Sequence, residues 1–409
     1  MGKQIITSLL DQDLYKFSMA QAIYHNYTDV NARYSFTCRS PNVNLTSFIG
    51  DIREQVNSFC NLQFTDRDIN KIKSKESLDF LKDDFLQHLR NTRLNSNYVT
   101  IRRTDEQGYI SIVIEGPWIN TIWFEVPILA IISELYMQQM IKAKEFNQHI
   151  LIDSHIRRIM EQINNAREKY NLEEFPKFAD FGTRRRASKT FQTSILDFLN
   201  KYKNYGCIGT SNVKMGLEKD MKIIGTMAHE WIMAHSAFTR FDLSQKMALD
   251  MWQKEYREKL GIALSDTYTT DFFLKDFDGL FSKSFSGIRQ DSGDPIEIGY
   301  KMIRHYDKLG INPTTKQIIF SDGLNFDKIA QLSKEFKGKI QTGFGIGTNL
   351  TNNIGIDPLS MVIKLSHIQY GNSTWYPTIK ISDSPGKIMC KDKEYEKFVQ
   401  KIIKDRTFI

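Results

Sequence analysis

The sequence predicts an α/β protein in which a parallel barrel carries a second domain built from both ends of the chain. Seven short apolar stretches between residues 178 and 347 each end in a polar or glycine-bearing cluster and precede a helix-like segment. Their spacing of about 15 to 40 residues is that of the βα units of a barrel. The residues before and after this region show hairpin and helix patterns instead, which indicates a separate domain.

The first third of the chain predicts a mixture of helices and strands. A strand is expected over residues 32–38, and residues 98–103 and 109–114 flank a Thr-Asp-Glu-Gln-Gly turn and predict a hairpin. Helices are expected where apolar residues recur at three- and four-residue steps, or where a charged segment keeps the helical pattern. The predicted helices are 11–26, 79–94, 123–140 and 142–170.

The polar residues at the carboxyl ends of the barrel strands are expected to lie on one face of the barrel. The loops that follow the strands of a parallel barrel gather at its carboxyl-terminal mouth, so clusters up to about 170 residues apart in sequence would line one pocket. An open doubly wound sheet is the alternative, but it would collect ligands only at a switch point. The strand ends are 178–183, 208–212, 223–226, 262–266, 287–291, 318–323 and 341–347.

The last fifty residues predict a return to the first domain. Residues 361–369 and 374–382 flank a Tyr-Gly-Asn-Ser turn and predict a second hairpin. We therefore predict an N-terminal α/β sandwich domain over residues 1–145 that is completed by 361–409, with the barrel domain over 146–360.

Composition favours a cytoplasmic protein that binds small anions. The 409 residues are 41% hydrophobic and 25% charged, as in ordinary globular proteins, and the net charge is +7. Lysines and arginines are interspersed with acids, which argues against nucleic acid as a partner. Four scattered cysteines suit a reducing compartment. The N-terminus lacks a signal-peptide pattern, and the longest apolar run, 126–132, is too short to cross a membrane.

The segment Gly-Thr-Met-Ala-His-Glu-Trp, ending at residue 231, places His229 where a strand meets a helix. The positive end of the helix dipole disfavours imidazolium there and keeps a neutral nucleophilic nitrogen near pH 7. A zinc site is excluded, because His235 follows six positions later and the two rings would lie about 120° apart around a helix. We expect His229 to be catalytic and His235 to face the packing side or solvent.

Three consecutive arginines follow the strand end at Asp180. Arg184, Arg185 and Arg186 would repel one another unless an anion lay among them, and guanidinium groups bind phosphate oxygens bidentately. Gly182 would let the backbone approach the phosphate. The alternative is a solvated basic turn, but the position at a barrel mouth favours an anion site.

Carboxylates end several of the other strands. Asp291 or Asp294, near Arg289, is expected to hold a Mg²⁺ that accompanies a diphosphate, or to form a hydrogen bond with a sugar hydroxyl. The alternative is a structural role, in which the aspartate caps a turn as an Asx cap. Asp266 is expected to orient and polarise His229. Asp322 is a further ribose-side or phosphate-side candidate.

The segment 343–349 carries glycines at alternate positions. It lacks the third glycine of a dinucleotide fingerprint at the required spacing, and it comes too late in the chain. At the mouth of the last barrel strand, Gly347 and its neighbours instead predict a phosphate cradle of backbone N–H groups. The sequence contains no Walker A motif, so ATP would have to be held by other means.

Taken in order, these motifs resemble the bacterial nicotinate phosphoribosyltransferase family over essentially the whole chain. A sister family that uses nicotinamide resembles the chain at Arg184, Arg289 and Asp291, but it has an aspartate for the amide near the position of Ser211 and Asn212, so an acid substrate is favoured. The resemblance rests on these segments: 13–16, 180–186, 209–212, 225–231, 289–295, 344–350 and 382–387.

The resemblance implies an ATP-assisted condensation of nicotinate with phosphoribosyl pyrophosphate (PRPP) in NAD salvage, with Mg²⁺ as cofactor. The implied fold is an irregular TIM-like α/β barrel of the type II phosphoribosyltransferases with an α/β sandwich domain. A homodimer would share the site, with Tyr15 serving the partner's pocket. His229 would accept the γ-phosphoryl group of ATP, Tyr15, Thr226 and Arg289 would contact nicotinate, and Thr348 would contact PRPP.

Two sets of residues follow from the motifs and the resemblance together. The catalytic set is His229, Asp266, Arg289 and Asp291. The substrate-binding set is Tyr15, Gly182, Arg184, Arg186, Ser211, Thr226, Asp322, Gly347 and Thr348. A nicotinamide phosphoribosyltransferase and a non-catalytic nucleotide sensor are the alternative functions.

Overall fold

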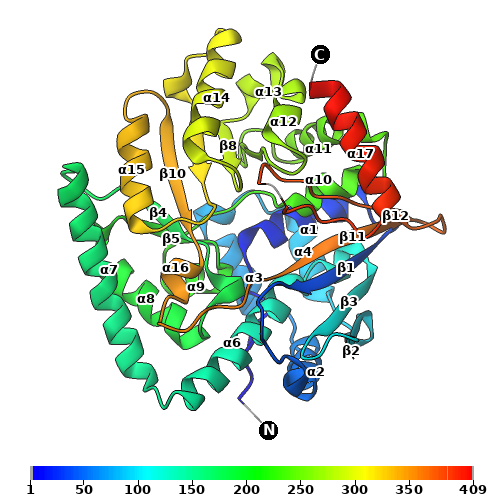
Figure 1. Cartoon of the computed structure of the whole chain (residues 1–409). Coiled ribbons are helices and arrows are strands. Elements are labelled where there is room, and N and C mark those ends of the chain that lie inside the picture. Colours follow the sequence, from blue (N-terminus) through cyan, green and yellow to red (C-terminus); the bar gives the residue numbers. More distant parts are fainter. Residues whose placement is uncertain (1–2, 385, 408–409) are drawn as a thin grey trace.

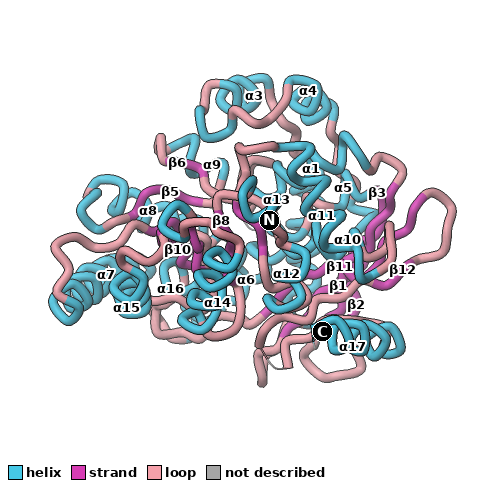
Figure 2. The backbone as a smooth tube through the Cα atoms, turned by 90° about the horizontal axis from the view of Figure 1, so that it is seen from above, coloured by secondary structure: helices cyan, strands magenta, loops and turns pink. Residues whose placement is uncertain are grey.

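The structure, a computed structural model, describes residues 3–384 and 386–407 and confirms the α/β class. Two sheets organise it, one of seven strands and one of five (Figure 1). Figure 2 shows them side by side, with helices around the seven-stranded sheet. Pro385, within the predicted 382–387 motif, lies outside the described residues.

All seven predicted barrel strands are present and pair in parallel, in the order β6-β5-β4-β10-β9-β8-β7. The edge strands β6 and β7 share no ladder in the described part of the chain. The hydroxyl of Thr226, just after β6, nevertheless donates to the carbonyl of Ile262 in β7 at 3.0 Å. Edges that approach this closely require a curled sheet, an incompletely closed barrel. The strands are β4 Phe178–Asp180, β5 Cys207–Thr210, β6 Lys222–Ile223, β7 Ile262–Leu264, β8 Gly287–Gln290, β9 Gln317–Phe320 and β10 Gln341–Ile346.

Most helices of the barrel begin at a side chain that caps the backbone. Ser188, Asn212, Thr269, Asp278, Asp294 and Asn325 each accept from an N–H of the first turn. The helices are α7 Gln148–Tyr170, α8 Lys189–Lys201, α9 Val213–Glu218, α10 His229–His235, α11 Phe241–Tyr256, α12 Thr270–Asp276, α13 Gly279–Ser284, α14 Pro295–Lys308, α15 Phe326–Phe336 and α16 Thr348–Thr351. Except for α13, which follows α12, each of the capped helices comes after a barrel strand in the chain.

Helix α1, Leu14–Asn26, packs along the open seam of the barrel. The amide of Leu14 donates to Ser211 at 2.8 Å, and the Ser18 hydroxyl donates to the Thr226 carbonyl at 2.5 Å. Gly225 allows α1 to approach the barrel closely, because a Cβ at this position would lie 3.1 Å from the Cβ of Leu14. The N-terminal segment thereby reaches the mouth of a barrel whose strands come much later in the chain.

The five-stranded sheet joins the two ends of the chain, in the order β12-β11-β1-β3-β2. Strand β1 pairs antiparallel with β11 from Val30 opposite Tyr370 to Cys38 opposite Met361, and with β3 on its other side. Both predicted hairpins are confirmed, and so is the expected discontinuous layer. The domain limits at residues 145 and 360 remain predictions. The strands are β1 Val30–Cys38, β2 Val99–Arg103, β3 Ile110–Pro117, β11 Met361–Tyr370 and β12 Tyr376–Pro377.

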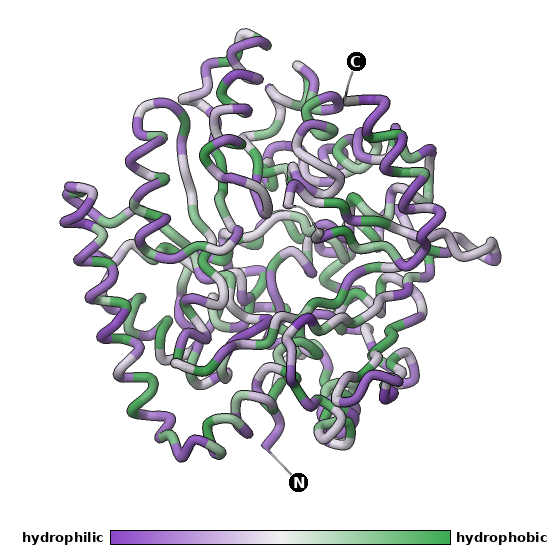
Figure 3. Tube along the Cα trace, viewed as in Figure 1, coloured by the Kyte–Doolittle hydropathy of each residue, from purple (hydrophilic) through white to green (hydrophobic). Residues whose placement is uncertain are grey.

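The long apolar helix α6, Glu125–Ala143, lies inside the molecule. The helical stretch 118–143 is long and apolar enough to cross a membrane, but 83% of its most apolar window is buried against the rest of the protein, as in a core helix. In Figure 3, hydrophobic (green) segments are more frequent toward the middle of the molecule, and hydrophilic (purple) ones on the outermost helices. The predicted helix 79–94 is shorter than expected, α4 Asp83–Asn91, and helices α2 Ile49–Cys60, α3 Asp66–Lys73 and α17 Lys393–Thr407 were not predicted.

Candidate active site

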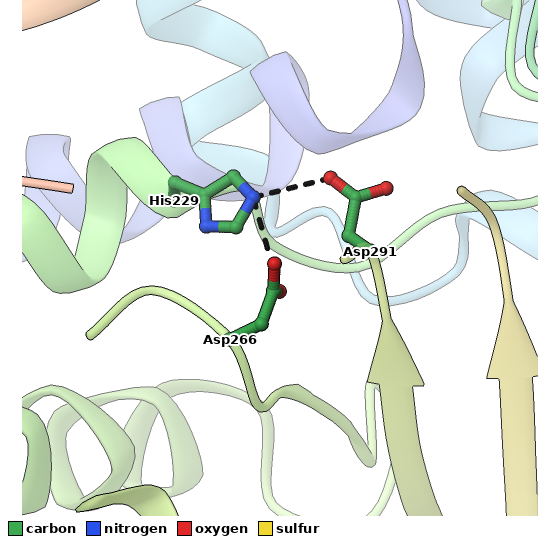
Figure 4. A group of neighbouring side chains, drawn as sticks. All are labelled: His229, Asp266 and Asp291. Carbon is green, nitrogen blue, oxygen red and sulfur yellow. Dashed lines mark hydrogen bonds and ion pairs between the residues drawn. The ribbon is translucent and has the colours of Figure 1, made fainter. Parts of the chain in front are cut away.

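His229 and two carboxylates meet at the mouth of the barrel (Figure 4). His229 is the first residue of α10, as the sequence predicts, and is only 2% exposed. Its Nε2 lies 3.1 Å from Asp291 Oδ2, and its Nδ1 lies 3.0 Å from the Thr267 hydroxyl. Burial, together with Lys380, holds the pKa of the ring well below its usual value, so the imidazole is neutral at pH 7.

The protonation of the ring follows from its partners. Burial opposes ionisation of Asp291, but Arg289 and the His229 ring hold the pKa of this carboxyl well below its usual range. An ionised Asp291 accepts only, so Nε2–H donates to it, and Nδ1 accepts from the hydroxyl of Thr267. The Ser321 hydroxyl donates to the other oxygen of Asp291 at 2.6 Å. Thr267 and Asp291 therefore fix the ring.

Asp266 does not hold the ring as predicted. Its Oδ1 lies 3.9 Å from His229 Nε2 and has no hydrogen-bond partner among the described residues, while its Oδ2 accepts from Ser292 at 2.5 Å. Burial raises the pKa of the Asp266 carboxyl to about 6. An unpartnered, fully buried carboxylate oxygen beside the ring is suited to receive a cation or a proton.

The three groups His229, Asp266 and Asp291 each offer a ligand atom within 4.8 Å of the others. Carboxylate oxygens are the donors that Mg²⁺ prefers, so Asp266 and Asp291 fit this ion. Asp294 does not belong to the group. It is exposed, and its side chain accepts from the amide of Glu297 as the N-cap of α14, which is the Asx cap considered as its alternative role.

The three arginines after β4 have different partners and different exposure. Arg184 is 38% exposed and is held loosely, with Nη1 3.4 Å from Glu125 and Nε 3.8 Å from Asp13. Arg185 donates to the carbonyl of Met361 from two nitrogens. Arg184 thus keeps donors free for an anion at the mouth, and its contact with substrate stays a prediction.

The predicted role of Arg186 is not supported. Its guanidinium is completely buried and donates to both oxygens of Asp11, at 2.9 and 3.0 Å, and to Glu134 at 2.7 Å. Gln192 completes the set at 3.4 Å. All three guanidinium nitrogens are engaged within the protein, so Arg186 has a structural function, not a pyrophosphate-binding one.

Tyr15 and Arg289 present unsatisfied polar atoms to the site. The Tyr15 hydroxyl is buried without a hydrogen-bond partner in the described chain, and its ring centroid lies 5.9 Å from the Arg184 guanidinium of the same chain. The Nε of Arg289 is likewise buried and unpartnered there, and Nη1 makes one 3.3 Å bond to the Met227 carbonyl. Both side chains have donors left for a ligand.

Ser211, Thr226 and Gly182 are already engaged with neighbouring segments. Ser211 donates to Asp13 at 2.7 Å, and the Thr226 hydroxyl bridges the barrel seam. The Gly182 amide donates to Asp180, and a Cβ at Gly182 would lie 2.2 Å from Thr351 Oγ1. This glycine therefore serves close packing, and the structure does not support its predicted contact with phosphate.

The remaining predicted residues lie at the ends of two adjacent strands. Asp322 follows β9 and lies 3.5 Å from Lys387, and Gly347 and Thr348 follow β10 at the start of α16. Strands β9 and β10 pair in parallel, which brings these ends to one edge. Gly347 and Thr348 are half-buried, so this loop remains accessible to a ligand.

Comparison with known proteins finds relatives over nearly the whole chain. Two family models match, the "Nicotinate phosphoribosyltransferase (NAPRTase) family" over residues 176–406 and its N-terminal domain over residues 10–133. A nicotinate phosphoribosyltransferase of Burkholderia cenocepacia is 42% identical over 400 residues, covering 97% of this chain and 96% of the relative. The chain belongs to the nicotinate phosphoribosyltransferase family.

Other members of the nicotinate phosphoribosyltransferase family match over similar lengths. A curated enzyme of Ralstonia nicotianae is 40% identical over 97% of this chain and 99% of its own. The crystal structure of the Vibrio cholerae enzyme superposes with a TM-score of 0.90 at 36% identity, over 98% of this chain and 94% of that one. The Porphyromonas gingivalis structure gives 0.88 at 30%, over 97% and 99%.

Several charged residues of the site were missed by sequence reasoning, and all of them except Glu230 come from outside the barrel. The segment after β12 crosses the barrel mouth, where the Ile381 amide donates to the Thr267 carbonyl at 2.8 Å. It carries Lys380, whose ammonium lies 3.7 Å from Asp266. The available signal for Lys364 was a lysine between the apolar residues Ile363 and Leu365 of β11. The other missed residues are Lys16, Glu125 and Glu230.

Lys364 should make anion binding in this nicotinate phosphoribosyltransferase family member sensitive to pH. Burial lowers the pKa of its amine to about 8, with Lys380 and Arg184 acting in the same direction and Glu125 opposing. The amine is charged below pH 8 and neutral above it. We expect affinity for inorganic pyrophosphate to fall about fivefold between pH 7 and pH 9, measured by calorimetry, because one cation is lost from the site. In Lys364→Met this fall should disappear; an unchanged fall would contradict the assignment.

Proposed function

We propose that the protein condenses nicotinate with PRPP to give nicotinate mononucleotide and pyrophosphate, coupled to ATP hydrolysis, in the salvage of NAD. The observation that carries the proposal is the neutral His229 with its two carboxylates, placed at one barrel mouth with the incompletely satisfied Arg184 and Arg289. Relatives at about 40% identity over nearly the whole chain bear the name of this activity.

Two anionic substrates need two cationic sites. Arg289, with its unpartnered Nε, is suited to the nicotinate carboxylate, and Tyr15 offers a second buried, unpartnered donor in its hydroxyl. Arg184, with Lys364 and Lys380 in its electrostatic surroundings, is suited to the pyrophosphate of PRPP. In the condensation the pyridine nitrogen attacks the anomeric carbon as the bond to pyrophosphate breaks. Such a reaction needs stabilisation of the leaving charge more than a proton carrier.

His229 is the proposed acceptor of the γ-phosphoryl group of ATP. Nε2 carries a lone pair for phosphorus only in the tautomer whose proton lies on Nδ1 and is donated to the Thr267 hydroxyl; in that tautomer the bond from Nε2 to phosphorus forms as the bond to the ADP oxygen breaks. Asp291, at 3.1 Å, and Asp266, at 3.9 Å and with its pKa raised to about 6, are placed to take the proton that leaves Nε2 in this change of tautomer. A phosphoryl group on Nε2 adds about two negative charges beside Arg289 and Lys380, which would reshape the substrate site.

Asp266 and Asp291 would hold Mg²⁺. The unpartnered Oδ1 of Asp266 and the donor set of two carboxylates fit this ion. When bound, Mg²⁺ neutralises charge on diphosphate oxygens. Arg184 contributes the same kind of stabilisation from the protein side, through guanidinium donors left free by Glu125 and Asp13.

We further propose that the enzyme is a cytoplasmic homodimer, as the resemblance implies. Tyr15 lies against Arg184 of its own chain, so one protomer already brings these two side chains together. Sedimentation equilibrium measures the assembly, and a monomer with full activity would contradict a shared site.

The decisive experiment measures nicotinate mononucleotide formation from nicotinate and PRPP, with and without ATP. We expect product only when both substrates are present, a higher yield with ATP, and turnover of nicotinamide at least about 10²-fold lower, because the amide leaves the Arg289 charge unpaired. Preferential turnover of nicotinamide would support the alternative, nicotinamide phosphoribosyltransferase. Binding of nucleotide without any product would indicate a sensor.

A further inference from the structure

Lys16 lies at the centre of a buried network of charges beneath the site. Its side chain is completely buried, and its ammonium lies 2.7 Å from Glu125 Oε2 and 2.6 Å from Glu230 Oε2. The second oxygen of Glu230 accepts from the Tyr34 hydroxyl at 2.6 Å and from the Trp118 indole at 2.8 Å. Every oxygen of Glu230 is therefore bonded within the protein.

The network connects Arg184, at the proposed anion site, with α10, the helix that carries His229. Glu125 turns its Oε1 toward Arg184 Nη1 at 3.4 Å, and Glu230 directly follows His229 in α10. Charges alternate along the chain of contacts from Arg184 through Glu125 and Lys16 to Glu230. Lys16 itself follows Tyr15 in α1. One buried ammonium thus links α1, α6 and α10, the helices that carry Tyr15, Glu125 and His229.

Glu125 is shared unequally between its two cations. Lys16 is 0.7 Å closer to it than Arg184, from the distances of 2.7 and 3.4 Å. Burial alone would raise the pKa of the Glu125 carboxyl, but Lys16 and Arg184 lower it to about 2, so this acid is charged at neutral pH. Burial alone would likewise lower the pKa of Lys16, but Glu125 and Glu230 raise it. A charged Glu125 without Lys16 would have Arg184 as its nearest cation.

We infer that Lys16 is a positioning residue for anion binding: by pairing with Glu125 it keeps the guanidinium of Arg184 available for a diphosphate at the barrel mouth. The contrast with Arg186 supports this. Arg186 is completely buried and is bound by two carboxylates at 2.7 to 3.0 Å, so it is not available to a ligand. Arg184 differs because Lys16 holds Glu125 more closely, at 2.7 Å, and leaves Arg184 only a 3.4 Å contact with this acid. This inference rests on the proposed function only in assigning diphosphate as the anion.

A purely structural role for Lys16 is the alternative, and a double variant separates the two. In Lys16→Met, Glu125 stays charged and forms a closer ion pair with Arg184. The affinity for inorganic pyrophosphate should therefore fall about tenfold. Adding Glu125→Gln removes the competing charge, so the double variant should return to within about threefold of wild type. A lost structural contact would instead make the double variant at least as weak as the single one.

Calorimetric titration with pyrophosphate and thermal unfolding are measured on all variants. Glu125→Gln alone keeps the shape of the side chain and remains informative if Lys16→Met does not fold: it should bind pyrophosphate at least as tightly as wild type. Lys75→Met, which removes an ion pair with the exposed Asp220, is the matched control and should bind normally. Unchanged binding by Lys16→Met, absence of rescue, or weakened binding by Glu125→Gln would overturn the role of Lys16. Wild-type protein that binds no pyrophosphate would overturn the anion site and, with it, the proposed function.

Discussion

Replacing His229 by asparagine is expected to abolish the stimulation of nicotinate mononucleotide formation by ATP. The amide of asparagine can still donate toward Asp291, so the buried pocket keeps a polar partner, but no ring nitrogen remains to accept a phosphoryl group. We expect ATP hydrolysis to fall by at least about 10²-fold, the range seen when a nucleophile or a proton-transfer group is removed. ADP release and product yield are measured together.

The condensation itself should survive in this variant at a basal rate. Arg184 and Arg289 remain in place, and the reaction depends on them for charge stabilisation. His149→Asn, at an exposed position in α7, is the matched control and should keep ATP stimulation. ATP stimulation that persists in His229→Asn would show that the energy of ATP is coupled to the reaction by another group.

The barrel could be predicted because its signals are local. Each strand is a short apolar run that ends in glycine or polar residues, and most of the helices that follow start at a capping side chain, so sequence order gives the units directly. The missed helices α2, α3 and α17 lie outside this repeating pattern. The helix expected over 142–170 begins later, at Gln148, because Asn147 caps it.

The site could be predicted only where one segment carries the signal. His229 at a strand–helix junction, and Arg289 in β8 with Asp291 directly after it, were found in this way. The contrast between Arg184 and Arg186 could not be found, because adjacent arginines look alike until their partners are known. The partners of Arg186, Asp11 and Glu134, lie 175 and 52 residues away in sequence. Long-range pairing, not the motif, decides which arginine is free.

Replacing Arg186 by methionine is expected to cost about 3 to 5 kcal/mol of unfolding free energy, because two buried carboxylates lose their partner. Burial alone would raise the pKa of Asp11, but Arg186 lowers it to about 2, and burial raises the pKa of Glu134. A carboxyl whose pKa is depressed by folding adds stability above its unfolded pKa, near 4, and loses it as the pH falls toward 2. The difference between wild type and variant should therefore be full at pH 7 and shrink below about pH 4, as measured by urea unfolding.

Arg184→Met is the matched comparison, two residues away in the same motif. Because Arg184 is partly exposed and loosely paired, this variant should unfold within about 1 kcal/mol of wild type. It should lose pyrophosphate binding, whereas Arg186→Met, where it remains folded, should retain it. The opposite result would be a stable Arg186→Met that no longer binds pyrophosphate. It would assign Arg186 to the anion site and show that Asp11 and Glu134 release it when substrate binds.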